Sequence, residues 1–113
     1  MAGNHLGRLR KGREFDSVYA EGIVVGGPLF VVRAKRSRES GTRWGFAVGK
    51  KLASKAVVRN RVRRRLREAA RAGDAPRGMD VVLTARPKVL DAPFQLLQGE
   101  LRRALAKLSE VLE

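Results

Sequence analysis

Apolar and polar residues alternate along two stretches of the chain, and this period of two predicts two β-strands. One stretch runs from Leu29 to Lys35 and the other from Arg43 to Lys51. In each, one side is mainly bulky and apolar, whereas the other is mainly small or basic. We expect the bulky side to face the core and the opposite side to leave room for a flat, negatively charged ligand.

Apolar residues at helical spacing predict a first helix over residues 11–21. Phe15, Val18 and Tyr19 stand at i, i+3 and i+4, so they share one face of this helix. Gly22 follows as a helix stop. The three side chains would serve either as core or as partly exposed platforms on which nucleotide bases stack.

Two longer helices are predicted in the second half of the chain. The first begins with Ser54 as its N-cap and ends near Gly73. Its narrow apolar stripe consists of Val58, Val62, Leu66, Ala69 and Ala70. The second is capped by Asp91, and its apolar face consists of Phe94, Leu97, Leu101, Leu105, Leu108 and Leu112. Gly99 costs that helix about 1 kcal/mol relative to alanine, so tertiary packing has to hold it.

The remaining segments complete an α+β architecture. Residues 1–10 form a basic, flexible tail, residues 36–42 a loop, and residues 79–86 a third clear strand that ends at Pro87. With a short additional strand near residues 23–25, the expected order is αβββαβα. A chain of 113 residues with this order predicts one domain, a sandwich of a sheet and helices.

The charge of the chain narrows the choice of partners. Lys and Arg number 25 against 11 acidic residues, which gives a formal net charge of +14. Such a domain repels itself unless a polyanion neutralises it, and nucleic acid is the natural polyanion. The sequence has no cysteine, no apolar signal segment and no run long enough to span a membrane, so we expect a cytoplasmic protein without a membrane partner.

The basic residues concentrate in residues 50–71, where ten of them stand with Glu68 as the one acidic residue. Like charges three or four residues apart destabilise an isolated helix by about a few tenths of a kcal/mol each, so folding alone does not explain them. Arginine binds phosphate oxygens bidentately and stacks on bases. Asn60, between Arg59 and Arg61, adds an amide that can bond a sugar hydroxyl, a base edge or a backbone group.

No catalytic site emerges from the residues themselves. The single histidine, His5, lies in the basic tail, the acidic residues are scattered, and no serine has a histidine partner in an ordered segment. No cluster has the spacing of metal ligands. We therefore predict neither a catalytic residue nor a metal site in the polypeptide.

The segment VGKKLASKAVVRNRVRRRLREA, residues 48–69, resembles the protein subunit of bacterial ribonuclease P. That family carries an Arg-Asn-Arg signature, here Arg59–Arg61, and a pair of lysines, here Lys50 and Lys51, at the end of the preceding strand. The segments RLRKGREFDSVYAEG, GFAVGKK and MDVVLTARP resemble its first helix, central strand and last strand, so the resemblance covers nearly the whole chain.

The resemblance implies a two-layer α/β sandwich like domain 2 of ribosomal protein S5. In that fold, the helix with the Arg-Asn-Arg signature connects two parallel strands by a left-handed crossover, against the usual handedness. The implied activity is that of a ribonucleoprotein: a large RNA holds the Mg²⁺ ions and cleaves precursor tRNA to give the mature 5′ end. The protein binds that RNA and the single-stranded 5′ leader of the substrate, with no further protein partner required.

The resemblance also assigns residues to two RNA-binding surfaces within a single domain spanning residues 1–113. The surface for the catalytic RNA comprises Lys50, Lys51, Lys55, Arg59, Asn60, Arg61, Arg63, Arg64, Arg65, Arg67 and Arg71. The cleft for the leader comprises Phe15, Val18, Tyr19, Val31 and Arg33. Some members carry an aromatic residue where this chain has Arg33, so we expect a phosphate contact there in place of base stacking.

The alternative is an RNA-binding protein without a nuclease role, such as a ribosomal protein or a general RNA chaperone. The net charge of +14 fits that class equally well. A groove one strand wide beside Phe15 and Tyr19 would favour the ribonuclease P subunit, whereas a flat surface would favour the alternative. A sequence-specific DNA-binding protein is less well supported, because the basic helix lacks a helix-turn-helix partner.

Overall fold

Five strands form one mixed sheet in the computed structural model, which describes residues 7–10, 12–37, 41–72 and 77–112. The strands are β1 (Gly7–Arg8), β2 (Ile23–Gly26), β3 (Phe30–Arg36), β4 (Arg43–Ala47) and β5 (Met79–Ala85). Their order across the sheet is β1-β4-β5-β3-β2. β4 pairs in parallel with β5 and β1, whereas β3 pairs antiparallel with β5 and β2.

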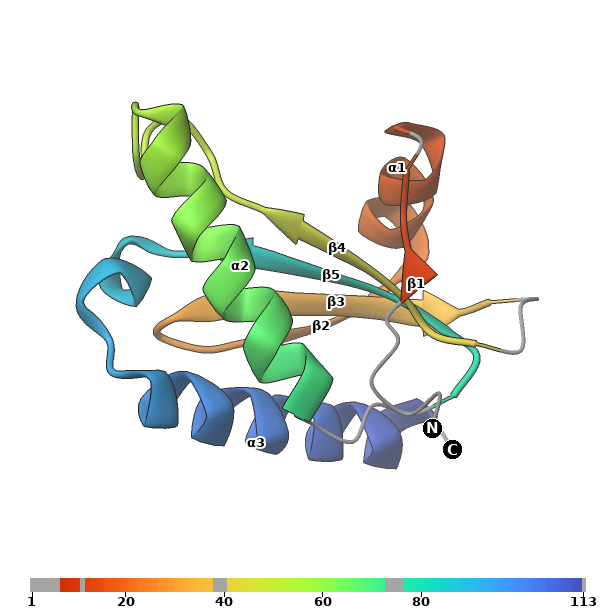
Figure 1. Cartoon of the computed structure of the whole chain (residues 1–113). Helices are drawn as coiled ribbons and strands as arrows, with labels where there is room; N and C mark the ends of the chain where they lie inside the picture. The colour runs from red at the N-terminus through yellow and green to blue at the C-terminus, as the bar shows by residue number, and fades with distance from the viewer. Residues whose placement is uncertain (1–6, 11, 38–40, 73–76, 113) are drawn as a thin grey trace.

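Helices cover both faces of this sheet. Those in the described residues are α1 (Gly12–Glu21), α2 (Ala56–Ala72), the 3-10 helix η2 (Pro87–Asp91) and α3 (Phe94–Leu112). Figure 1 shows α2 crossing in front of the strands and α3 along the lower side, with α1 apart from both at the upper right. The order of these elements confirms the predicted αβββαβα, to which β1 and η2 are added.

The helix α2 forms a left-handed crossover between neighbouring parallel strands. It connects β4 to β5, which lie in register from the pair Arg43 and Asp80 to the pair Ala47 and Thr84. In Figure 1 both strands run toward the left, α2 lies in front of them and β5 lies below β4, which is the left-handed sense. Parallel crossovers are right-handed in nearly all other proteins, so this connection is a distinctive mark of the fold.

The main core lies between the sheet and the helices α2 and α3. Alternate strand residues point into it, as the period of two predicts. The strands supply Phe30, Val32, Ala34, Trp44, Phe46, Met79, Val81 and Leu83. The helices supply Val62, Leu66, Ala69, Ala70, Leu97, Leu101, Ala104, Leu105 and Leu108. Because this burial turns the apolar stripe of α2 inward, its arginines have to point outward or along its flanks.

The helix α1 packs on the opposite face of the sheet through a much smaller apolar cluster. Val18 is fully buried with Leu9 and Val82, and Phe15 packs against the same cluster. Gly45 makes room for Phe15, since a Cβ atom there would lie under 3.0 Å from the phenyl ring. With so few apolar contacts to hold α1, its polar contacts have a large share in fixing its direction.

The described N-terminal residues do not form the flexible tail predicted for residues 1–10. Gly7 and Arg8 pair with β4 as a parallel edge strand. The Leu9 N–H donates to the Trp44 carbonyl at 3.0 Å, and the Leu9 side chain is buried. The prediction is wrong for this part because the neighbours of Leu9 in the sequence are charged. Its apolar contacts, Val18 and Val82, are brought next to it only in the folded chain. Residues 1–6, with His5, lie outside the described residues.

The start of α2 differs from the prediction because the chain first makes a turn. β4 ends at Ala47, and the Gly49 carbonyl then accepts hydrogen bonds from the N–H groups of residues 52 and 53 at 3.2 and 3.3 Å. The helix begins at Ala56, and the Lys55 carbonyl accepts its first hydrogen bonds. Ser54 is therefore not the N-cap. The predicted stop, residue 73, lies outside the described residues.

The start of α3 also lies later than predicted. Asp91 is the last residue of η2, and the Pro93 carbonyl accepts the first hydrogen bonds of α3, so Asp91 does not cap it. Phe94 stays 37% exposed, although the leucines after it form the expected buried face. The reason is that Pro87 starts a short 3-10 helix, which displaces the next helix along the chain. The side chain of Leu112 lies outside the described residues.

Two glycine-to-alanine substitutions are expected to change stability in opposite directions. A Cβ atom at Gly22 would lie under 3.0 Å from the Val18 carbonyl oxygen, to which the Gly22 N–H donates at 2.7 Å. Gly22→Ala should therefore lower the free energy of unfolding by about 2 kcal/mol. A Cβ atom at Gly99 would meet nothing, so Gly99→Ala should raise it by about 1 kcal/mol. Urea unfolding tests the pair, and equal midpoints would contradict it.

Candidate RNA-binding surfaces

The helix α2 presents a broad positively charged surface. The exposed basic residues of this helix and of the preceding turn, together with Asn60, form what we name the α2 surface: Lys50, Lys51, Lys55, Asn60, Arg61, Arg64 and Arg71. Glu68 pairs with Arg71 at 2.7 Å and is the acidic residue of this helix. The α2 surface therefore carries a charge that a polyanion would neutralise.

Asn60 orients one of its neighbouring arginines. Its Oδ1 accepts a hydrogen bond from Arg63 Nη1 at 2.9 Å, one turn further along the helix. The amide group keeps its two N–H donors for other partners. The uncharged Asn60 thus separates the cationic side chains of Arg59 and Arg61. It also positions the half-buried guanidinium of Arg63 at the border of the α2 surface.

Two arginines predicted to bind RNA are bound to the main chain of the protein itself. Arg59 Nη1 donates to the carbonyls of residues 53 and 54 at 2.9 and 2.7 Å, which fixes the turn before α2. Arg65 Nη1 donates to the Val89 carbonyl at 3.2 Å, and Arg65 Nη2 donates to the Ala92 carbonyl, which ties α2 to η2. Both side chains are half-buried, so they support the α2 surface more than they form it.

Arg8 of β1 extends the positive charge along the flank of α2, and the sequence interpretation missed it. Burial first, and then the charges of Arg8, Arg71 and Arg63, lower the pKa of the Arg67 guanidinium. Its carbon lies 5.3 Å from the centre of the Phe46 ring, a cation–π distance. A phosphate bound here would relieve the repulsion among these cations. The alternation of uncharged and basic residues in the segment GRLR, residues 7–10, was the available signal for an ordered strand.

A second candidate surface lies on the other face of the sheet, beside α1. Tyr19 is 43% exposed, and the Arg33 guanidinium carbon lies 5.1 Å from the centre of its ring. The Tyr19 hydroxyl lies 3.4 Å from Thr84 Oγ1, and Val31 is the half-buried strand partner of Thr84. These four residues are named the Tyr19 surface. An exposed ring beside a cation and a hydroxyl suits a stacked nucleotide and its phosphate.

Phe15 and Val18, both assigned to a leader cleft, differ in what they can contact. Phe15 is half-buried over Gly45, next to the Tyr19 surface on α1. Val18 is 0% exposed, so its assignment to the cleft is wrong, because a fully buried side chain cannot touch a ligand. It supports the surface from beneath by packing on Val82.

Two cavities of the described residues lie away from the Tyr19 surface. One, of about 180 Å³, lies between the turn after β2 and the middle of α3. The other, of about 490 Å³, lies beside the opposite flank of α1 and is lined by Glu14, Ser17, Lys35, Arg43 and Asp80, among others. Neither is lined by Tyr19, so the groove of single-strand width beside this residue stays a prediction.

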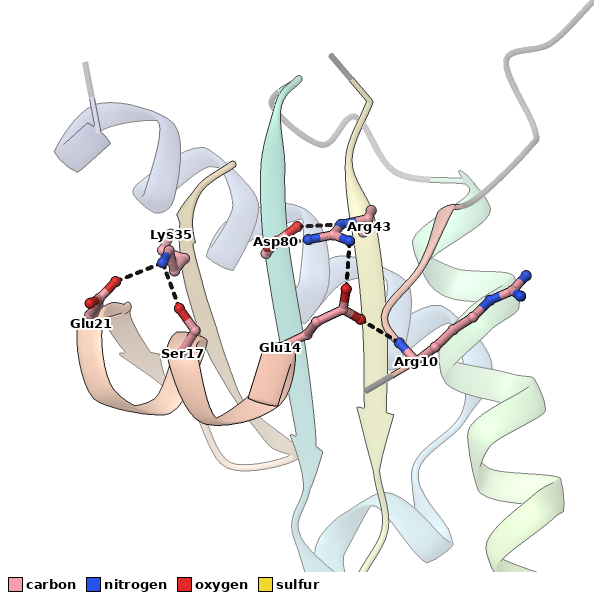
Figure 2. A network of polar contacts seen from close by, with 7 residues as sticks. All are labelled: Arg10, Glu14, Ser17, Glu21, Lys35, Arg43 and Asp80. Atoms are coloured by element: carbon pink, nitrogen blue, oxygen red, sulfur yellow. Dashed lines mark hydrogen bonds and ion pairs between the residues drawn. The ribbon is translucent and has the colours of Figure 1, made fainter. Parts of the chain in front are cut away.

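The opposite flank of α1 carries ion pairs where the sequence suggested an open basic face. Figure 2 shows Arg43 between two carboxylates: Nε and Nη2 donate to Asp80 at 2.9 Å each, and Nη1 donates to Glu14 at 2.9 Å. The other oxygen of Glu14 accepts the Arg10 N–H at 2.8 Å. Asp80 is the one buried charged residue among those described. Hydrogen bonding to Asp80 is the largest cause that raises the pKa of Arg43 above its ordinary value.

Lys35 makes a similar contact at the other end of α1. Its Nζ donates to Ser17 Oγ and to Glu21 Oε1, both at 2.6 Å (Figure 2). The hydrogen bond and the charge of Lys35 lower the pKa of the exposed Glu21 carboxyl. Glu14, Ser17 and Glu21 stand at the spacing of one helix flank, so the acidic flank of α1 is matched to the basic residues of the strands beneath it.

In the part of the chain that the structure describes, neither surface is accompanied by a metal-binding cluster. Within the described residues, no three His, Cys, Asp or Glu side chains gather so that they could hold a metal ion. No helix in the same part of the chain is long and apolar enough to cross a membrane. What the two surfaces offer is contact with phosphates, bases and sugars.

The fold and its surfaces define an RNA-binding protein whose basic helix forms a left-handed crossover. The sequence model of the family Ribonuclease P matches residues 4–109. The chain belongs to the ribonuclease P protein family, whose role is the processing of tRNA at its 5′ end.

Individual relatives agree with this membership. The ribonuclease P protein component of Symbiobacterium thermophilum is 44% identical over 106 residues, which cover 91% of this chain and 88% of the relative. That of Gluconacetobacter diazotrophicus is 43% identical over 104 residues, which cover 88% of this chain and 89% of the relative. The solved RNase P protein from Thermotoga maritima matches with a TM-score of 0.79 at 29% identity, covering 88% of this chain and 96% of that one. The Staphylococcus aureus RNase P protein matches with a TM-score of 0.78 at 26% identity, covering 96% of this chain and 100% of that one.

Proposed function

We propose that this chain binds the RNA subunit of ribonuclease P through the α2 surface, and that this RNA carries out the cleavage. The observation that carries the proposal is the exposed row of basic side chains around Asn60, most of which have no acidic partner among the described residues. Arginine and lysine on a rigid helix suit the phosphates of a folded RNA, which have fixed positions. On this proposal the polypeptide contributes binding and no catalytic residue.

The Tyr19 surface is proposed to bind the single-stranded 5′ leader of precursor tRNA. Its support is the combination of an exposed aromatic ring and Arg33, because base stacking on a ring tolerates any sequence and a guanidinium binds the phosphate between bases. Leaders differ in sequence between tRNAs, so contacts of this kind fit them better than base-specific hydrogen bonds.

Magnesium enters this proposal through the RNA. We propose that the Mg²⁺ ions required for cleavage are held mainly by the RNA subunit, where phosphate oxygens are the hard ligands this ion prefers. The cations of the α2 surface would neutralise RNA phosphates and thereby lower the concentration of Mg²⁺ at which the RNA folds and binds substrate.

Single-turnover cleavage of a precursor tRNA by ribonuclease P RNA tests this proposal. At low millimolar Mg²⁺, the RNA with this protein should cleave at the mature 5′ end, the RNA alone should be slow, and the protein alone should cleave nothing. A control with 10-fold higher Mg²⁺ should restore part of the activity of the RNA alone. Binding of the RNA without any gain in cleavage would instead favour a general RNA chaperone or a ribosomal protein.

A further inference from the structure

We propose that Glu14 and Arg43 are positioning residues for leader recognition, because they hold α1 at the angle that places Tyr19 beside Arg33. The inference rests on the proposed function, since it takes the Tyr19 surface as the contact with the leader. Neither residue belongs to that surface. They act from the opposite flank of α1, where Figure 2 shows Arg43 joined to Glu14 and Asp80.

The path of α1 over β5 shows why one flank controls the other. Val18 packs on Val82, at the middle of the crossing. Two residues before Val82 lies Asp80, bound to Arg43, and two residues after it lies Thr84, in contact with Tyr19. Since the side chains of alternate strand residues point to the same face, all three stand in one row under the helix. If α1 rolled about its own axis, the flank with Glu14 and the flank with Tyr19 would move in opposite directions.

Apolar contacts alone do not prevent such a roll. The cluster under α1 consists of three buried residues, Leu9, Val18 and Val82, with Phe15 packed against them. The main core, by contrast, lies entirely on the other face of the sheet. The direction of α1 therefore depends on contacts at its two ends, which are the Arg43 contact with Glu14 in the first turn and the Lys35 contact with Glu21 in the last.

Arg43 is the stronger of these two attachments. Its planar guanidinium binds both oxygens of Asp80 and reaches Glu14 with a third N–H group, a geometry that lysine cannot reproduce. The side chains of Arg43, Glu14 and Asp80 are only 28%, 22% and 9% exposed, so water screens the contact little, whereas Glu21 in the Lys35 pair is 67% exposed. Glu14 also accepts the Arg10 N–H, which fixes the residue that leads from β1 toward α1.

Substrate kinetics with the assembled holoenzyme test the proposal. Glu14→Gln and Arg43→Lys should each raise KM about fivefold for a precursor tRNA with a long leader, with kcat unchanged. KM for a substrate whose leader is a single nucleotide, and the affinity for ribonuclease P RNA, should not change. The double variant should be no worse than the single ones, because both break the same contact. Glu100→Gln is the matched control: it removes the 2.8 Å pair with Arg103 on α3, and every value should equal that of the wild type.

Amide hydrogen exchange gives a readout that does not depend on activity. In Glu14→Gln, the amides of residues 12–21 should exchange faster than in the wild type, whereas those of α2 should keep their rates. The substitution leaves the Arg43 contact with the buried Asp80 intact, so it decides the question even if Arg43→Lys does not fold.

The outcomes separate this inference from the proposed function. If the wild-type holoenzyme makes no distinction between long and short leaders, the proposed function of the Tyr19 surface fails, and the exchange rates alone decide whether Glu14 holds α1. If the wild type makes that distinction and both variants retain it, the positioning role is overturned. Weaker assembly with the RNA in Glu14→Gln would also overturn it, because the residue would then act on the whole fold.

Discussion

Arg65→Ala is expected to lower the free energy of unfolding by about 3 kcal/mol, the largest loss among the arginines of α2. The guanidinium of Arg65 donates to the carbonyls of Val89 and Ala92. These hydrogen bonds join α2 to the end of η2. Removal of the side chain takes a charged donor from each of these carbonyls, of which that of Val89 keeps another donor, the Ala92 N–H at 3.3 Å, and it also deletes the packing of the aliphatic stem. A domain of this size is stable by only about 5–15 kcal/mol, so the loss should be plain in a urea titration.

Trp44 offers the probe for that titration, since it is the only tryptophan and is buried in the main core. The matched control is Arg64→Ala, which removes an exposed arginine one residue away. Its free energy of unfolding should stay within about 0.5 kcal/mol of that of the wild type. Its affinity for ribonuclease P RNA should fall, and the slope of log affinity against log salt should become shallower by about one. A normal midpoint for Arg65→Ala with a lowered one for Arg64→Ala would show that the two roles are assigned the wrong way round.

Tyr19→Ala should remove most of the preference for substrates that carry a leader, a loss of about tenfold in relative affinity. One base stacked on an aromatic ring contributes about 1–3 kcal/mol, and the ring is 43% exposed on a surface that also holds Arg33. Affinities of the holoenzyme for precursor tRNA and for mature tRNA, measured under conditions that prevent cleavage, give the preference directly.

Tyr19→Phe separates the ring of this residue from its hydroxyl. It keeps the stacking surface and loses only the 3.4 Å contact with Thr84, so leader preference should stay close to that of the wild type. If Tyr19→Ala weakens the binding of precursor and mature tRNA by the same factor, the Tyr19 surface does not contact the leader. If Tyr19→Phe is as defective as Tyr19→Ala, the hydroxyl and not the ring makes the contact.

Local patterns in the sequence were sufficient to predict the core and the basic surface. A period of two placed Phe30, Val32, Trp44 and Phe46 on the buried side of their strands, because side-chain direction in a strand depends only on position along it. In the same way, the apolar stripe of α2 predicted Leu66 in the core, which left the arginines outside. The resemblance to the family then identified that helix as the left-handed crossover. Hydrophobic periodicity alone does not predict how a helix connects two strands.

The roles of individual charged residues could not be predicted in this way. Arg64 and Arg65 are neighbours in one basic run, yet one is exposed and the other binds carbonyls 24 and 27 residues further along the chain. Arg43 was expected on an open basic face, but its partners Glu14 and Asp80 lie 29 and 37 residues away. A guanidinium has the same sequence pattern in both roles, so only its surroundings in the folded chain distinguish them.

The sequence by itself therefore determined the three α-helices and the four longer strands, most of their buried faces and that the partner is a polyanion, because periodicity and charge act over short distances. Only the tertiary structure decided that β1 pairs with β4 as an edge strand, that Val18 supports the Tyr19 surface from within, and that Glu14 and Arg43 fix the direction of α1. Each of these depends on contacts between segments far apart in the chain, which form only when the whole sheet is assembled.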